Sequence, residues 1–240
     1  MPSLYYTLLA SLPPLPRSIV IERMPISRVR LDERLKMLEE HDAELLRELR
    51  LLLSLPGIDQ NMIAEHEEIE HEIRPVRKRT IDTETEFVAH FESKIALMKN
   101  RAAIKVVGEY FDTLLILNAM IRRMHDMPPL ENDRPIAVHI KRYWRRNYFA
   151  LDDQYRWIAE VEHRLRDGDM LAVYRILLED LHRQWGLASC LTQFSPDALV
   201  LYIARWELLN HWASLDADQG KKTIDTIVKE AIGDYDQYFA

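Results

Sequence analysis

The stretch AAIKVVGEYFDTLLILNAMI, residues 102–121, decides the fold class of this 240-residue chain. It is the most apolar part of the sequence, and it is long enough for a helix of about five turns. Lys105, Glu109 and Asp112 interrupt it, and each would be costly at the centre of a bilayer. A helix that spans a membrane needs about 20 mostly apolar residues. We therefore predict a helix that is buried inside the protein.

Helical periodicity continues on both sides of this segment. Apolar residues recur every three or four positions, and Ser, Asp and Pro stand where helices would begin. The predicted helices cover 27–40, 42 to the stop at 56–57, a stretch from 59, a stretch from 80 or 82, 136–149, 152–166, 169–187, 196–213 and 218–232. Residues 5–12 are rich in aromatic and apolar side chains and precede three prolines, which predicts a short extended segment.

These ranges predict an all-α protein. We expect a multi-helix bundle of about nine or ten helices in two packed subdomains, with the short extended segment at the N-terminus. The proline-rich stretch 128–135 is the best candidate for a boundary. The predicted subdomains are therefore 1–127 and 128–240.

The composition excludes several classes of protein. Hydrophobic residues make up 48% of the chain and charged residues 30%, so it has enough apolar surface to fold. The net charge of -7 argues against a globally basic nucleic-acid binder. A single cysteine excludes an internal disulfide framework and fits a cytoplasmic protein. The N-terminus lacks the basic region of a secretory signal, so none is predicted.

Three Glu-x-x-His pairs are the strongest enzyme-like signal. Such pairs hold metals in four-helix di-iron proteins, because residues three apart share one helix face. All three pairs are predicted to lie away from the apolar stripe of their helix, with only one histidine at a stripe edge. We therefore predict no metal site, and keep a metal-dependent helical-bundle enzyme as the alternative. The pairs are Glu68/His71, Glu160/His163 and Glu179/His182.

Two basic segments are candidate partner-binding sites. One follows the acidic run 65–72, and the other interleaves basic and aromatic residues over 141–148. In the second segment Ile140, Trp144 and Tyr148 are four apart, which predicts an apolar seam with a basic outer face. Single-stranded nucleic acid is the other ligand that such a mixture suits, and we favour an acidic protein over it. The candidate residues are Arg142, Arg145, Arg146, Arg77, Lys78 and Arg79.

Motifs for catalysis and nucleotide binding are missing from the sequence. It contains no Gly-x-Ser-x-Gly, no P-loop and no Gly-x-Gly-x-x-Gly. Cys190 is placed in a loop with no identifiable base beside it, so a packing role is predicted. We predict no catalytic residue, no cofactor and no direct contact with a nucleotide.

Two stretches of the chain resemble a bacterial family of unassigned activity that is commonly encoded among V-type ATPase subunits. The first stretch is YYTLLASLP at 5–13, followed by Pro-Ile-Ser at 25–27. The second stretch combines aromatic residues and a glycine around a bulky helix, at Phe194, Tyr202, Trp212 and Gly220. The resemblance implies a component of, or factor for, a prokaryotic V-type ATPase. Proteins of this family are similar in outline to the helical C (or d) subunit of the V-type ATPase. This chain is shorter than that subunit.

The expected function follows from this resemblance and from the missing catalytic motifs. We expect a non-catalytic subunit or accessory factor that contacts ATPase proteins in the stalk or coupling region. It would be cytoplasmic and peripheral to the inner membrane through its partners. A helical adaptor for an unrelated partner is a further alternative.

Overall fold

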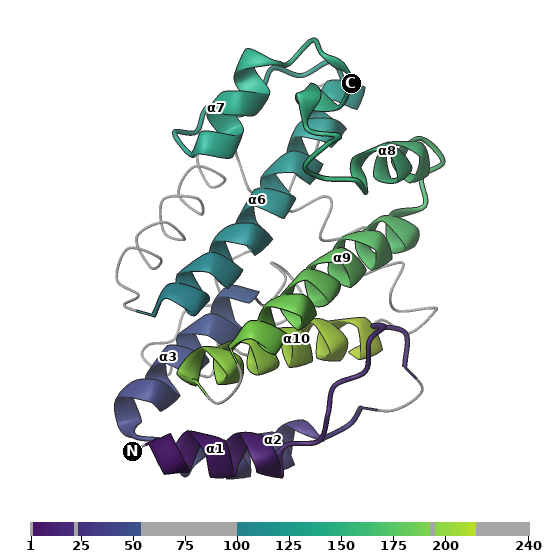
Figure 1. Cartoon of the computed structure of the whole chain (residues 1–240). Coiled ribbons are helices and arrows are strands. Elements are labelled where there is room, and N and C mark those ends of the chain that lie inside the picture. The colour runs from purple at the N-terminus through teal and green to yellow at the C-terminus, as the bar shows by residue number, and fades with distance from the viewer. Residues whose placement is uncertain (1, 22–23, 54–99, 193–194, 215–240) are drawn as a thin grey trace, which may run out of the picture.

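A computed structural model describes residues 2–21, 24–53, 100–192 and 195–214 of the chain as a set of packed helices (Figure 1). Within these ranges there are eight α-helices and no strand, which confirms the all-α prediction. The helices are α1 (Pro2–Ser11), α2 (Arg28–Leu35), α3 (Glu40–Leu53), α6 (Arg101–Met124), α7 (Pro135–Arg142), α8 (Ile158–Arg166), α9 (Met170–Leu191) and α10 (Pro196–Ser214).

Helix α6 is the buried helix that its apolar sequence predicts. The side chain of Asn100 caps it by accepting a hydrogen bond from the backbone N–H of Ala103, at 2.9 Å. Val107 and Ile116 are fully buried, whereas the side chain of Lys105 remains two-thirds exposed. Within the described ranges, no helix combines the length and the hydrophobicity that crossing a bilayer requires.

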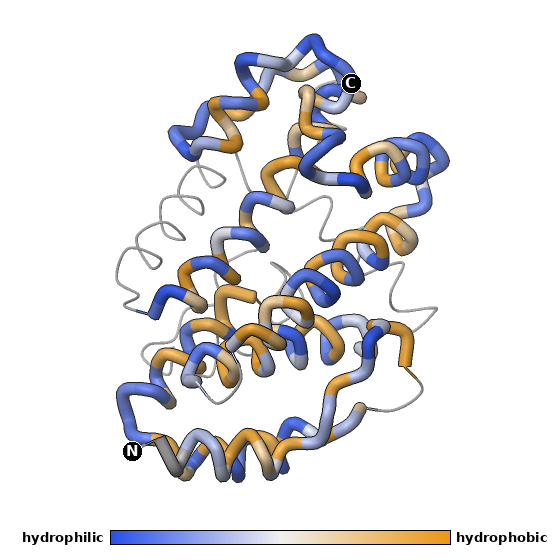
Figure 2. Tube along the Cα trace, in the orientation of Figure 1, coloured by the Kyte–Doolittle hydropathy of each residue, from blue (hydrophilic) through white to orange (hydrophobic). Residues whose placement is uncertain are grey.

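Helix α10 lies at the centre of the lower half of the molecule. Helices α1, α3, α6 and α9 all pack against it (Figure 1). Its buried residues occur on every side of the helix rather than in one stripe, as in a helix enclosed by neighbours. Apolar residues also run along α9, its main neighbour (Figure 2). Leu199, Ile203 and Trp206 of α10 join the hydrophobic core that these helices share.

The N-terminal segment is helical, so the prediction of an extended segment at 5–12 is wrong. Leu8 is fully buried and Leu12 is 8% exposed, while Tyr5 is half-buried. Tyr5 and Leu8 are three positions apart and lie on one face of α1, which packs against α10, and Leu12 follows directly after the helix ends. The aromatic composition suggested a strand, but the spacing of the buried residues suits a helix.

The predicted helix 136–149 is also wrong in its second half. Helix α7 ends at Arg142, and a turn leads to a 3₁₀ segment at Asn147–Ala150. Tyr148, Phe149 and Ala150 have φ values of 50°, 56° and 56°, in the left-handed region that residues with a side chain rarely adopt. Phe149, in the middle of this left-handed stretch, is completely buried.

Several predicted boundaries shift by a few residues. Helix α2 ends at Leu35 rather than at 40, α3 begins at Glu40 rather than at Asp42, and α8 begins at Ile158 rather than at 152. Helix α9 continues to Leu191, so Cys190 lies on an exposed helical turn and not in a loop. The predicted helices from 59, from 80 or 82 and at 218–232 lie outside the described residues. The division into 1–127 and 128–240 stays a prediction.

Two buried histidines predict that the fold loses stability in acid. Burial lowers the pKa of His182 and of His211 to about 4, and the charges of Arg205 and Arg28 act in the same direction. Below their unfolded pKa of about 6.5, the unfolded chain binds protons that the folded chain cannot bind. Stability therefore falls as the pH drops from 6.5 towards 4. Burial raises the pKa of Glu207, which gives the opposite slope and offsets part of the loss.

We expect acidification from about pH 7 to about pH 5 to cost roughly 2 kcal/mol for each histidine, before that offset. Urea unfolding at both pH values measures the change. The double variant His182→Gln/His211→Gln should show a smaller dependence on pH, because glutamine does not titrate. Equal pH dependence in the variant and the wild type would contradict this assignment.

Candidate partner-binding surfaces

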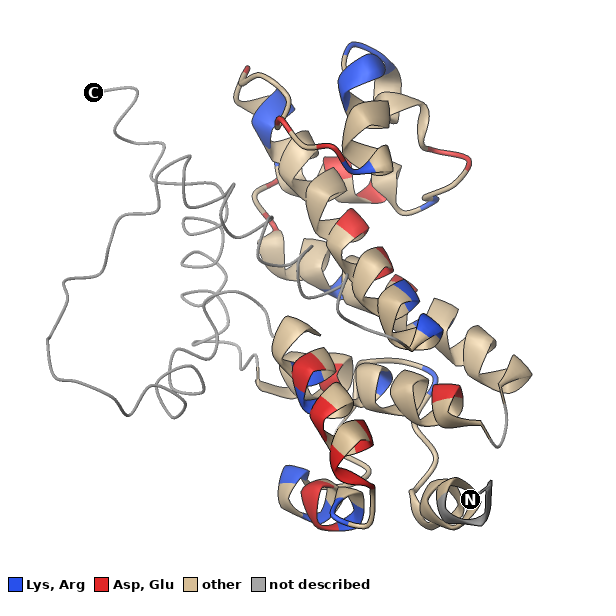
Figure 3. Cartoon of the chain, turned by 90° about the vertical axis from the view of Figure 1, so that its left-hand side faces the viewer, with Lys and Arg blue, Asp and Glu red and all other residues tan. Residues whose placement is uncertain are grey.

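The predicted basic residues that the structure describes lie together at the end of α7. Arg142 is the last residue of α7, and Arg145 and Arg146 lie in the turn that follows. All three are exposed, and basic residues mark this end of the molecule in Figure 3. Arg77, Lys78 and Arg79 lie outside the described residues. The structure thus brings together one of the two candidate sites.

The turn that carries these arginines is held from beneath by α6 and α7. A guanidinium N–H of Arg123 donates to the carbonyl oxygen of Arg146 at 3.0 Å. The guanidinium carbon of Arg123 also lies 4.4 Å from the ring centre of Phe149. His139 Nε2 is 3.1 Å from the carbonyl oxygen of Phe149. These contacts keep the turn in its left-handed conformation despite the strain.

The aromatic residues of this segment point inward and the arginines point outward. Ile140 is buried, and Trp144 and Tyr148 are half-buried. The ring of Trp144 stacks on Phe149 with centres 5.4 Å apart, so this face of the indole is already occupied. The arginines are exposed and the apolar residues are buried or half-buried, but the single helix on which the predicted seam rested is wrong, because α7 ends at Arg142. Stacking with bases has less support, because the rings serve the core.

The basic turn keeps its charge uncompensated. Lys141, the nearest basic neighbour, pairs with Glu131. The side chains of Arg142, Arg145 and Arg146 have no ion pair within the described part of the chain. Exposed and unpaired arginines are available to carboxylates of a partner.

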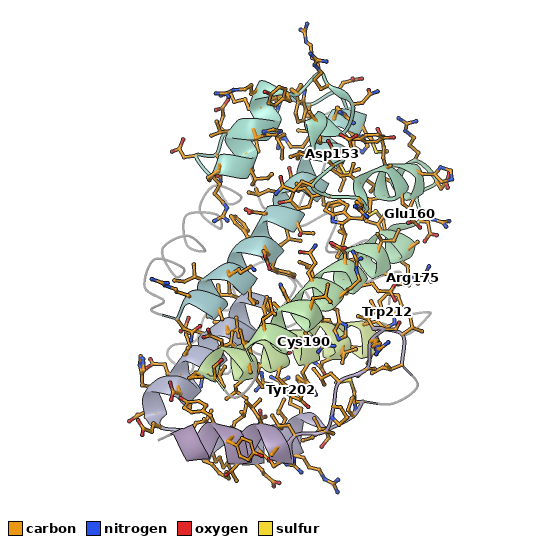
Figure 4. The ribbon with its side chains drawn as sticks, viewed as in Figure 1. Asp153, Glu160, Arg175, Cys190, Tyr202 and Trp212 are labelled. Atoms are coloured by element: carbon orange, nitrogen blue, oxygen red, sulfur yellow. The ribbon has the colours of Figure 1, made fainter. Side chains whose placement is uncertain are left out.

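The Glu-x-x-His pairs lie apart from one another. Glu160, which Figure 4 labels near α8, and His163 are both exposed on that helix, as predicted. His182 is fully buried, so its predicted position at the edge of the apolar stripe is corrected. Glu179 accepts a hydrogen bond from the hydroxyl of Ser18 at 2.9 Å. That contact shows that residues near 18 cover this face of α9. Glu68/His71 lies outside the described residues.

Among the described residues, no group of three or more His, Cys, Asp and Glu side chains is arranged to hold a metal ion.

The two stretches that carry the family resemblance meet in the structure. We call residues 12–21 and 24–27, which connect α1 to α2, the strap. Three donors on α10 hold carbonyl oxygens of the strap. The Tyr202 hydroxyl donates to Pro13 at 2.8 Å, a guanidinium N–H of Arg205 donates to Pro16 at 3.0 Å, and the Trp206 indole N–H donates to Ile26 at 3.1 Å. Figure 4 shows Tyr202 on the side of α10 that faces α1.

These contacts explain the types of residue on both sides. Prolines keep the strap out of regular structure, so its carbonyl oxygens need donors from elsewhere. Burial raises the pKa of Tyr202 to about 12, which keeps its hydroxyl protonated and able to donate. Arg205 and Trp206 were missed by sequence reasoning, because only the fold shows that they face the strap. Trp212 is half-buried, and Phe194 and Gly220 lie outside the described residues.

A pocket of about 1010 Å³ opens beside the strap. It is lined by residues 10–13, residues 24–27 and two arginines of α2, Arg30 and Arg34. The lining therefore includes the Ala-Ser-Leu-Pro and Pro-Ile-Ser motifs of the first stretch. We call it the strap pocket. Sequence reasoning did not identify Arg30 or Arg34 as site residues.

Comparison of the chain with models of known protein families, with curated protein sequences and with solved structures found no significant match. The resemblance to the V-type ATPase-associated family therefore depends on the two stretches that meet at the strap.

Proposed function

We propose that this chain is a non-catalytic subunit or accessory factor of a prokaryotic V-type ATPase. It acts at the cytoplasmic face through contacts with proteins of the stalk or coupling region. It reaches the membrane only through those partners, and it binds no nucleotide itself.

The observation that carries this proposal is the hydrogen bonding of α10 to the strap. The two stretches that resemble the family lie far apart in the sequence, and their contacting residues Tyr202 and Pro13 are 189 positions apart. They nevertheless pack as one unit through Tyr202, Arg205 and Trp206. A pattern shared with a family has structural meaning when its separate parts form one element. This joint element supports the family relationship.

The packing of the helices also suits a component that transmits force. Trp185 and Trp206 are almost completely buried, and the described core is one connected cluster that includes residues of α1, α3, α6, α8, α9 and α10. Close-packed interiors have low compressibility and transmit strain. A coupling subunit needs this property and needs no reactive group of its own.

Affinity purification tests the proposal. The full chain would carry a C-terminal tag at native expression level, and membranes would be solubilised gently before capture. We expect the catalytic and rotor-ring subunits of a V-type ATPase to be recovered with it. Recovery of the chain without any ATPase subunit, under conditions in which the ATPase itself stays intact, would argue decisively against the proposal.

The basic turn gives a second prediction. Reversing three charges in Arg142→Glu/Arg145→Glu/Arg146→Glu should weaken binding to the partner at least tenfold, which is about 1.4 kcal/mol, because each glutamate repels an acidic surface. The loss should shrink in high salt, since exposed charges are screened. Quantitative capture at two salt concentrations measures both effects.

A matched control makes the same change in net charge at three arginines outside the basic turn. Arg47, Arg101 and Arg175 are exposed on three other helices, and their triple change to glutamate should leave capture unaffected. Both triple variants should unfold within about 0.5 kcal/mol of the wild type, as exposed substitutions usually do. Equal loss of capture in both variants would mean that net charge matters and the turn does not.

A further inference from the structure

We propose that the strap pocket binds an acidic, partly apolar peptide segment of a partner protein. This inference deepens the proposed function, and it depends on that function only in taking the occupant to be a protein.

The charge of the pocket selects an anion. Arg30 and Arg34 are four residues apart, so they lie on one face of α2, and both line the pocket. No acidic residue is among the described lining residues. Guanidinium groups form strong, charge-assisted hydrogen bonds with carboxylates, so the two lining arginines favour a ligand that carries a carboxylate.

The volume and the apolar lining of the strap pocket favour a peptide over a simple anion as its ligand. The volume of about 1010 Å³ is at the upper end of the range of about 300–1,000 Å³ that holds organic ligands. Beside the arginines, Pro13 and Pro25 contribute partly exposed proline surface, while Leu12 and Ile26 are only 8% and 5% exposed and form the base of the lining. An inorganic ion would leave most of this surface uncovered. A segment that alternates acidic and aliphatic side chains would pair with the arginines and also bury apolar area.

The pocket is formed before any ligand binds. The indole of Trp206 holds the carbonyl of Ile26 at one side, and the hydroxyl of Tyr202 holds that of Pro13 at the other. The hydroxyl of Ser27 caps α2 by accepting from the backbone N–H of Arg30 at 3.4 Å. The walls therefore need little ordering on binding, which lowers the entropic cost of association.

Selection from a phage-displayed library of random heptapeptides tests the proposal without assuming a sequence. The full-length chain would be the bait, and the variant Arg30→Glu/Arg34→Glu would be the counter-selection. We expect the enriched peptides to combine Asp or Glu with Leu, Ile, Met or Phe. Fluorescence anisotropy with one of the enriched peptides, carrying a label, should show at least tenfold weaker binding to the Arg34→Glu variant than to the wild type. The same loss is expected for the Arg30→Glu variant.

Two controls separate charge at the pocket from other effects. Arg47→Glu makes the same change of charge on α3, outside the pocket, and should bind like the wild type. Arg30 is exposed, so Arg30→Glu should fold normally even if Arg34→Glu does not, as circular dichroism would show. The loss of binding should become smaller with rising salt, as for any partly exposed ion pair.

Three outcomes would overturn the proposal. The first is that no peptide is enriched. The second is that the enriched peptides are neutral or basic, or that their binding does not depend on Arg30 and Arg34. The third is displacement of the peptide by millimolar inorganic phosphate, which would make the pocket a simple anion site. Enrichment of acidic peptides without co-purification of an ATPase would support the pocket and argue against the ATPase, so the two proposals fail separately.

Discussion

Replacing Arg50 by methionine is expected to destabilise the fold by about 3–5 kcal/mol, because it leaves a buried carboxylate without its main counter-charge. The guanidinium of Arg50 on α3 pairs with Glu207 on α10 and with Asp32 on α2. Its carbon atom also lies 5.5 Å from the ring centre of Trp206. The side chains of Arg50 and Glu207 are only 14% and 8% exposed, so water cannot replace the lost partner.

Removing one partner of the Arg50–Glu207 pair should lower the stability of the fold strongly, whereas replacing both partners by apolar residues should lower it much less. Burial raises the pKa of Glu207, and the charge of Arg50 opposes that rise. A well-packed apolar pair of similar volume often matches or exceeds a buried ion pair in stability. The double variant Arg50→Met/Glu207→Leu should therefore regain more than half of the loss. Asp32 is 44% exposed and can be solvated in that variant.

Urea unfolding of the wild type, both single variants and the double variant measures this prediction. Arg47→Met is the matched control, because Arg47 is exposed on the same helix and its change should cost less than about 0.5 kcal/mol. A loss below about 1 kcal/mol for Arg50→Met would show that the ion pair is not part of the stable core.

Trp206→Ala is the second substitution with a large expected effect. Trp206 is fully buried at the centre of α10, and removing a buried tryptophan typically costs about 3–5 kcal/mol. The change also removes the indole N–H from the carbonyl of Ile26, so the strap loses one of its three hydrogen bonds to α10. We therefore expect loss of stability and release of the strap together.

Two further variants divide these contributions. Trp206→Phe keeps most of the apolar volume and removes only the donor, so it should cost about 1–3 kcal/mol. Trp212→Ala, at a half-buried position six residues further along α10, should cost less than Trp206→Ala. Chemical denaturation gives the free energies, and limited proteolysis of the strap reports its release. If Trp206→Phe costs as much as Trp206→Ala, packing around the ring contributes little and this interpretation is wrong.

The elements that sequence could predict are those with a clear pattern of burial. Helix α6 follows from residues 102–121, because an apolar run of that length with scattered charges suits only a buried helix. Helix α10 follows from Ser195-Pro196, which marks a helix start. The exposure of Arg145 and Arg146 agrees with the sequence prediction, but the spacing argument behind it assumed a helix that ends at Arg142 in the structure.

The features that sequence could not predict depend on contacts between distant segments. The left-handed turn at Tyr148–Ala150 contains no glycine, and it forms because Arg123 and His139 hold its backbone. His182 is buried because residues around Ser18 cover its face of α9. Arg30 and Arg34 form a pocket only because α10 holds the strap beside them. Local periodicity contains no information on such long-range contacts.

ATP-driven ion transport in membrane vesicles tests the central proposal most directly. Vesicles would be prepared from cells that lack this chain and from cells in which the chain, or its Arg142→Glu/Arg145→Glu/Arg146→Glu variant, has been restored. We predict that transport is lost without the chain, returns with the wild type and returns poorly with the variant, while the catalytic subunits are present in equal amounts in all samples. Undiminished transport in vesicles that lack the chain would contradict a role in this ATPase.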